Sequence, residues 1–144
     1  KRAAQLIGSD RPTPRSDVIQ AYRSSLTTPG DAANGAKVFQ RDCATCHRLG
    51  NQGHDVGPNL ATVRHRRADE ILTAILDPNR AIEDKYLQYL AQTDDGLQLA
   101  GVIVTETDAT VTLGTVEGKE ITLQRERLEA FEATGRSLMP DGFE

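Results

Sequence analysis

Hydrophobic and polar positions alternate differently in the two halves of the chain. In residues 16–26, from Asp31 to about Asp42, and again in 68–77, hydrophobic residues recur three and four positions apart. This spacing places them along one face of a helix. From Tyr86 onward, short β-branched and alternating runs replace it, as is typical of strands. The pattern predicts three helices followed by a small antiparallel β-sheet.

Turn-forming residues set the expected ends of these elements. Asp31 is a suitable N-cap for the second helix, and Asp77 and Pro78 end the third, after which Pro78 can open a short helical turn. Four strands are expected, over 87–93, 98–105, 110–116 and 120–123, with the intervening turns at Asp94-Asp95-Gly96, Asp108-Ala109 and Glu117-Gly118. Residues 125–134 fit either a helical turn or a fifth strand, and 135–144 are expected to form a loop.

The composition indicates that the side chains alone form only a small hydrophobic core. Aromatic residues are 4% of the 144, with no Trp, and aromatic residues usually supply much of the buried area. A group other than the side chains is therefore expected to contribute to the core. No apolar run approaches the ~18–20 residues of a membrane span, so no membrane insertion is expected.

The charge is unevenly distributed. Residues 1–67 carry a net charge of +6 and residues 68–144 a net charge of −10, which gives −4 for the chain. Apart from the run Arg64-His65-Arg66-Arg67 the basic residues are scattered. A nucleic-acid binder needs a basic face with groups that read bases beside it, so binding to nucleic acid is not expected.

The chemistry is concentrated in Cys43-Ala44-Thr45-Cys46-His47, a C-x-x-C-H motif. Two intervening residues place the thiols one helical turn apart, where both can add to the vinyl groups of a haem. The adjacent His47 can then serve as an axial ligand of the iron. A porphyrin would also supply the apolar mass that the composition lacks. We therefore expect one haem c, held covalently through Cys43 and Cys46.

Three other interpretations of the motif remain open. A thioredoxin-like redox pair would need a preceding strand and a parallel sheet, which the pattern does not predict. A zinc site would need His54 and His65 to complete a set with Cys43 and Cys46, and a zinc-binding interaction module is therefore a distinct alternative. A structural disulfide across two residues would close a strained ring.

The motif and its surroundings resemble class I cytochromes c. The residues that carry the resemblance are Gly35, Phe39, Cys43, Cys46 and His47, which look like the first helix and haem site of that family. In that family the glycine and the aromatic residue pack against a later element. Gly57-Pro58-Asn59-Leu60 is similar to the family's proximal loop, which implies that the Pro58 carbonyl accepts a hydrogen bond from Nδ1 of His47. Taken alone, Gly57-Pro58 would equally suit an ordinary turn.

Longer stretches resemble the haem-binding domain of Planctomycete and Verrucomicrobia type. They are GDAANGAKVFQRDCATCHRLGNQGHDVGPNLATVRHR, EILTAILDPNRAIEDKY and SLMPDGFE. The resemblance implies a module that closes a larger secreted protein, often one with a propeller-type dehydrogenase domain. The expected organisation is a linker and helix over 1–30 and a cytochrome c domain over 31–144. The fold class is then a mainly α cytochrome c fold (α+β overall) with a β-rich insertion, about 86–134, between the third helix and a distal methionine loop.

Met139 is the expected second axial ligand, opposite His47. A lone methionine is more often a filler of apolar gaps, but a late Met-Pro pair is the class I pattern and the resemblance ends on the same SLMP. His/Met ligation raises the reduction potential. His54, seven residues past His47, is expected on the same side as that ligand, and His65 lies in a basic surface run, so both are weaker candidates. The side chains expected to line the haem are Phe39, Leu60, Val63, Leu72, Ile75, Leu76 and Leu138.

These features together favour single-electron transfer over catalysis, because no separate acid–base pair accompanies the motif. The chain is thus expected to be a carrier and not an enzyme, with a redox protein or a fused dehydrogenase domain as its partner. An alternative is a haem-based sensor or gas-binding module in which Met139 is displaceable. Since haem is attached to C-x-x-C-H outside the bacterial cytoplasm, a periplasmic or otherwise extracytoplasmic location is expected.

Overall fold

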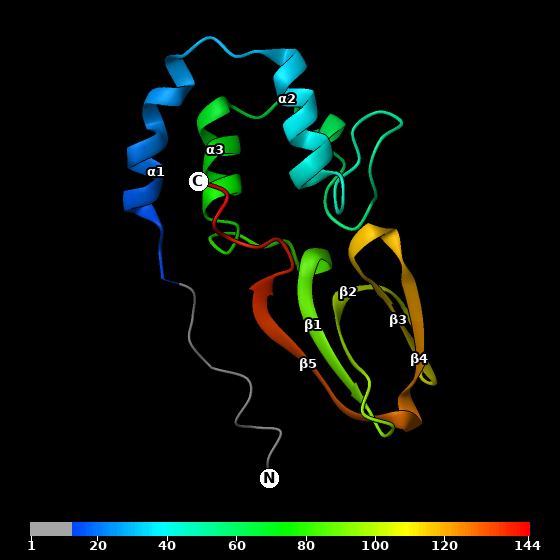
Figure 1. Ribbon diagram of the computed structural model, residues 1–144. Helices are drawn as coiled ribbons and strands as arrows, with labels where there is room; N and C mark the ends of the chain where they lie inside the picture. Colours follow the sequence, from blue (N-terminus) through cyan, green and yellow to red (C-terminus); the bar gives the residue numbers. More distant parts are fainter. Residues whose placement is uncertain (1–12) are drawn as a thin grey trace. The chain divides into compact units, whose positions relative to one another are not determined.

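The computed structural model describes residues 13–144, shown in Figure 1. These form two compact units. The helical unit comprises residues 14–81, 116–118 and 139–144, and the sheet unit comprises 82–115 and 119–138. Most of the expected linker, residues 1–12, lies outside the described residues. Within them, no helix is long and apolar enough to cross a membrane.

The first two helices of the helical unit match the expected positions. α1 (Ser16–Tyr22) continues as the 3-10 turns of η2 (Arg23–Thr27). α2 (Ala32–Val38) is capped as predicted, because the Asp31 carboxylate accepts hydrogen bonds from the N–H groups of Ala33 and Asn34 at 2.9 and 3.1 Å. Such a cap satisfies donors that have no partner within the helix. Residues Phe39–Cys43 extend α2 as a π-helical turn, η3.

α3 (Ala68–Leu76) confirms the third helix and packs against α1 and η2. The Glu70 carboxylate accepts a hydrogen bond from the Arg67 N–H at 2.9 Å, which fixes the first turn. After Asp77 the chain forms a single hydrogen-bonded turn at Pro78, where a short helical turn was expected. The Arg80 N–H closes it by donating to the Asp77 carbonyl at 3.1 Å.

Five strands form one antiparallel sheet in the order β4-β3-β2-β1-β5. They are β1 (Leu87–Thr93), β2 (Gln98–Glu106), β3 (Thr110–Gly114), β4 (Glu120–Gln124) and β5 (Leu128–Ser137). β3 ends two residues earlier than expected, because Thr115 donates its N–H to the Lys119 carbonyl at 2.8 Å and the chain turns at η6 (Val116–Gly118). Residues 125–134 combine both expected alternatives: a 3-10 turn, η7 (Arg125–Arg127), leads directly into β5.

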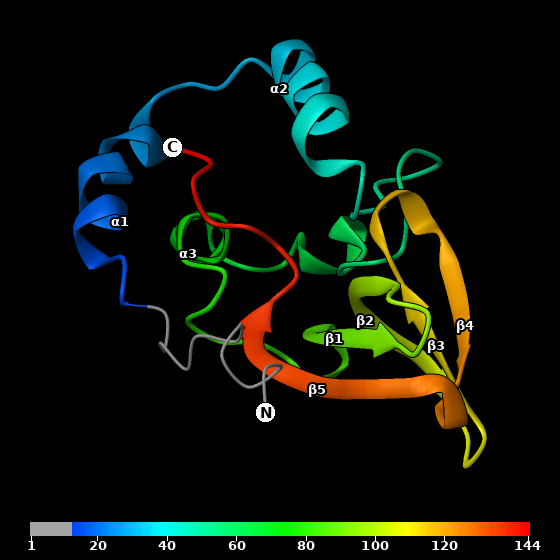
Figure 2. The same ribbon diagram turned by 60° about the horizontal axis from the view of Figure 1, so that its bottom comes forward.

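The last strand returns to the first. β5 pairs with β1 from Thr93↔Leu128 to Leu87↔Ser137, and Figure 2 shows β5 running alongside β1. The expected C-terminal loop therefore begins only after Ser137. The sheet starts and ends on neighbouring strands.

The sheet carries its own hydrophobic core. The buried residues of this core are Ala91, Val111, Leu113 and Leu123. Leu113 and Val111 are fully buried, and burying such a side chain stabilises a fold by about 1.5–3 kcal/mol. The rings of Tyr89 and Phe131 stack beside it with centroids 5.2 Å apart. The three expected helices and the five-stranded antiparallel sheet together give the α+β fold class that the sequence predicts.

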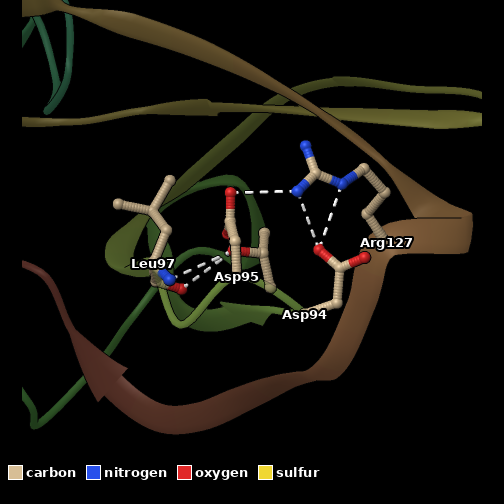
Figure 3. A network of polar contacts seen from close by, with 5 residues as sticks. Asp94, Asp95, Leu97 and Arg127 are labelled. Atoms are coloured by element: carbon tan, nitrogen blue, oxygen red, sulfur yellow. Dashed lines mark hydrogen bonds and ion pairs between the residues drawn. The ribbon is translucent and has the colours of Figure 1, made fainter.

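A network of ion pairs joins the β1–β2 turn to the start of β5 (Figure 3). Arg127 donates from Nη2 to Asp94 at 2.8 Å and to Asp95 at 2.9 Å, and the Asp94 N–H donates to the Arg127 carbonyl at 2.9 Å. The Thr93 hydroxyl donates to Asp95. This hydrogen bond, followed by the pairing with Arg127, lowers the pKa of Asp95. The network fixes one end of the sheet.

Candidate functional site

The C-x-x-C-H motif forms a single tight turn at the end of the π-helical segment. The carbonyl of Cys43 accepts the N–H groups of Cys46 at 3.1 Å and of His47 at 2.9 Å. The Ala44 N–H donates to the carbonyl of Phe39 at 2.8 Å, and Phe39 is buried. Phe39 thus anchors the start of the turn, and the two cysteines lie one helical turn apart, as expected. We refer to residues 43–47 as the attachment turn.

Both cysteines are half-buried free thiols. Burial, and to a smaller extent the charge of Asp42, raises the pKa of Cys43, and burial raises the pKa of Cys46. Burial therefore favours the neutral thiol at both positions. Among residues 13–144 no three His, Cys, Asp or Glu side chains are close enough to hold a metal ion. The zinc interpretation finds no ligand set in this part of the chain.

The imidazole of His47 is fixed by the loop that follows. Nδ1 of His47 lies 2.8 Å from the carbonyl oxygen of Pro58. Since a carbonyl only accepts, the ring N–H is on Nδ1, and the lone pair of Nε2 is available to a metal. A partner of this kind holds a ligating histidine in one orientation and strengthens it as a donor. The contact that the resemblance implied is thus present.

Two glycines allow this loop to approach the attachment turn. A Cβ at Gly57 would lie 2.6 Å from Cε1 of His47, and one at Gly53 would lie 2.0 Å from the His47 carbonyl oxygen. The N–H groups of Val56 and Gly57 donate to the Cys46 carbonyl at 3.0 and 2.7 Å. No local pattern marks Gly53 as a site residue, and only the position of Gly57 beside Pro58 in the proximal-loop motif points to that glycine.

The segment after Pro58 is held to the same region. The Leu60 N–H donates to the Arg48 carbonyl at 2.8 Å, and the Asn59 side chain caps the short helix η4 (Leu60–Val63) by accepting the Ala61 N–H at 3.0 Å. Leu60 and Val63 are half-buried. The structure therefore brings the backbone of Leu60 next to that of Arg48, directly after the attachment turn.

The three α3 residues that were expected to line the haem differ in their exposure to solvent. Leu76 is buried and Leu72 half-buried, but Ile75 is 40% exposed. Gly35 likewise lacks the close packing that the resemblance implied, since a Cβ there would meet no atom within 4 Å. The roles of Leu72, Ile75 and Leu76 as haem-lining residues stay predictions.

Met139 is half-buried in the bend that follows Leu138, also half-buried, after β5. The chain beyond it is tied down within the helical unit by Arg15. The Arg15 guanidinium pairs with Glu144 and donates to the carbonyl of Leu76 at 3.0 Å, and its backbone N–H donates to the buried Asp77 at 3.3 Å. The segment that contains Met139 therefore ends at the C-terminal end of α3. Ligation by Met139 stays a prediction.

The two histidines considered as alternative ligands, His54 and His65, lie outside the attachment turn. His65 is exposed, and His54 is half-buried next to Gly118. Gly118 belongs to the η6 turn between β3 and β4.

The residues present fit a covalently bound haem. In the described part of the helical unit, the buried apolar residues are Phe39, Val56, Leu76 and Pro78. So small a protein core suits a large flat apolar group. The donor set also fits, because two free cysteine thiols and an imidazole with Nε2 available are the groups that haem c requires. The candidate site is therefore consistent with covalent attachment of haem c.

Comparisons with known proteins agree with this chemistry. The family model described as cytochrome c matches residues 32–108. Cytochrome c of Ulva intestinalis is 52% identical over 33 residues, and that of Stellaria longipes is 53% identical over 32 residues. Each match covers 22% of this chain and 30% of the relative, so the chain spans less than a third of the length of these relatives.

A likeness among solved structures is too slight to support an inference. A crystal structure of the pleiotropic translational regulator Hfq shares 16% sequence identity with this chain at a TM-score of 0.30. The match covers 49% of this chain and 94% of that one.

Proposed function

This chain belongs to the cytochrome c family, and from that premise we propose that it carries single electrons through one haem c, bound to Cys43 and Cys46 and ligated by His47 and Met139. Membership of the family implies haem and electron transport. The observation that best supports the specific site is the 2.8 Å contact between Nδ1 of His47 and the Pro58 carbonyl. It leaves Nε2 as the ring nitrogen that can bind iron.

When bound, haem supplies an iron that exchanges one electron between its ferrous and ferric states. The chain's part is to hold the ligands still. The Pro58 carbonyl retains the proton on Nδ1 of His47 and orients the ring. Gly57 and Gly53 keep the loop close enough for that hydrogen bond. A ligand that keeps its place in both oxidation states makes reorganisation small, as an electron carrier requires.

Met139 supplies the second axial ligand in this proposal. A thioether is a soft donor that favours the ferrous state and raises the potential. Support comes from the position of Met139 before Pro140 and from the Arg15 contacts that tie the end of this segment to α3. Along the chain, the β-rich stretch of about 86–134 would then be an insertion between the third helix and the methionine loop, within a cytochrome c domain of residues 31–144.

The wider setting rests on the sequence resemblance. We assign the chain to the haem-binding domain of Planctomycete and Verrucomicrobia type on the three stretches quoted above. The proposed partner is a redox protein or a fused dehydrogenase domain. Because haem is attached to this motif outside the cytoplasm, the proposed location is periplasmic or otherwise extracytoplasmic.

Absorption spectra of the oxidised and reduced protein, with and without carbon monoxide, test the proposal. We expect a low-spin c-type spectrum, a methionine–iron charge-transfer band when oxidised, and no response to carbon monoxide. A high-spin reduced form that takes up carbon monoxide would support the sensor alternative. A protein without haem, purified from a host able to attach it, would contradict the proposal.

A further inference from the structure

The turn between β3 and β4 makes direct contact with the attachment turn. The backbone N–H of Glu117 donates a hydrogen bond to the carbonyl of Thr45 at 2.9 Å. Thr45 is one of the two residues between the cysteines. Residues 116–118 accordingly group with the helical unit, although the strands on either side belong to the sheet unit.

The turn adopts an unfavourable backbone conformation in making this contact. Glu117 has φ 62° and ψ 20°, and it is the only residue other than glycine with positive φ among residues 13–144. Gly118 follows with φ 68°. Hairpin turns with two successive residues of positive φ favour Asn-Gly or Asp-Gly, and a glutamate there is strained. Strain of this kind persists where the surroundings fix it, and it often marks a functional site.

The turn makes a second contact, with a residue that follows His47 in the sequence. A Cβ at Gly118 would be 2.6 Å from Nδ1 of His54 and 3.1 and 3.3 Å from Cγ and Cβ of the same residue. Gly118 thus packs directly against the half-buried His54 ring. The turn therefore contacts the chain on both sides of Cys46 and His47, at Thr45 and at His54.

We propose that residues 116–118 are a positioning element for the haem-attachment turn. The Glu117 N–H holds the Thr45 carbonyl, while the N–H groups of Val56 and Gly57 hold that of Cys46. The backbone that carries Cys46 and His47 is thereby fixed at consecutive peptide groups. When residues 116–118 are released, the Thr45 carbonyl loses its hydrogen bond and water enters beside the attachment turn. The added water lowers the reduction potential.

The inference rests on the proposed function for its effect on potential, but the docking itself is measurable without haem. The test is amide hydrogen exchange and redox titration of the full chain carrying Gly118→Ala. We expect the Glu117 amide to exchange about tenfold faster or more, the Cys46 and His47 amides to lose protection, and the potential to fall.

Three further variants separate docking from general stability. Adding His54→Ala to Gly118→Ala removes the ring that collides with the new Cβ but keeps the strain of alanine at φ 68°, so it should recover most of the slow exchange and of the parental potential. Gly96→Ala introduces the same kind of strain at another hairpin turn, where φ is 85° and no atom lies within 4 Å of the new Cβ. It should leave the attachment turn and the potential unchanged. Glu117→Gly relieves the strain while keeping the N–H, so the turn should stay docked.

The proposal would be overturned if Gly118→Ala left exchange and potential at parental values, or if Gly96→Ala or Glu117→Gly shifted them as much. Failure of the double variant to recover would also contradict it. If the parent protein carried no haem, the proposed function would fail, yet the exchange data would still report on docking. The two failures are therefore distinguishable.

Discussion

Nδ1 of His47 lies 2.8 Å from the carbonyl oxygen of Pro58, in the loop that follows the attachment turn. This one hydrogen bond determines which ring nitrogen carries the proton and which can bind iron. It also depends on the residue before Pro58, because only a glycine leaves room for the ring at that position.

Gly57→Ala should displace the His47 ring, since the added Cβ would lie 2.6 Å from Cε1. We expect haem to remain attached through the cysteines and the free energy of unfolding to fall by about 1–3 kcal/mol, as overpacking usually costs. Denaturant unfolding measures the free energy of unfolding, and mass spectrometry of the denatured protein shows whether haem is still attached. Gly30→Ala, with no atom within 4 Å of the new Cβ, is the matched control. Equal behaviour of the two variants would show that Gly57 does not constrain the ring.

Replacing both Cys43 and Cys46 with Ser should abolish covalent haem attachment, because a hydroxyl does not form the thioether bonds. Mass spectrometry of the denatured protein measures the loss directly. Haem that survived denaturation in the double variant would overturn the assignment of the attachment site.

Met139→Ala should leave haem attached but open the sixth position on the iron. The methionine–iron charge-transfer band should disappear, the potential should fall, and the reduced protein should bind carbon monoxide. Met139→Leu keeps an apolar side chain of similar size without the sulfur, so it should show the same spectral changes. If both variants kept the parental spectrum, Met139 would not be a ligand.

Asp95 should make the sheet sensitive to acid. The Thr93 hydroxyl and Arg127 lower its pKa in the folded state, below the value of about 3.9 expected when the chain is unfolded. The stabilisation that ionised Asp95 contributes is therefore complete above about pH 3.9. It is lost as the pH falls through the lower pKa of the folded state. Asp95→Asn should flatten the dependence of stability on pH in this acid range. Asp108→Asn, at an exposed turn residue, should retain the parental dependence when both are followed by circular dichroism.

Leu113→Ala should destabilise the sheet by about 2–5 kcal/mol, the usual cost of removing a buried leucine side chain. Leu113 is fully buried among Val111, Leu123 and Ala91. Leu97→Ala, at a residue that is 45% exposed, serves as the control and should change stability far less. Chemical denaturation of both variants measures the difference.

Local patterns in the sequence predicted the structural features that depend on neighbouring residues, such as strand ends and helix caps. β1 begins and ends where its alternating residues and the Asp94-Asp95-Gly96 turn place it, and Asp31 caps α2 as its side chain suggests. The cysteine spacing likewise predicted a single turn. Each of these features depends on interactions within a few residues.

Contacts between distant residues were beyond such patterns. Nothing in Glu117-Gly118 distinguishes it from an ordinary hairpin turn, yet its N–H reaches Thr45. The π-helical turn at Phe39–Cys43 and the room that Gly57 leaves for His47 also depend on packing. Residues 125–134 were ambiguous because the segment holds a helical turn and a strand in succession.

The pairing of Leu87 with Ser137 has a consequence for protein engineering. The chain enters the sheet at one of these residues and leaves it at the other, and paired residues on antiparallel strands lie about 5 Å apart. A short peptide that bridges the two positions would preserve the distance between the chain's entry and exit points. It would also remove residues 116–118 and their hydrogen bond to Thr45, so a reporter or a binding loop is better inserted at the Asp94-Asp95-Gly96 turn, which leaves that contact in place.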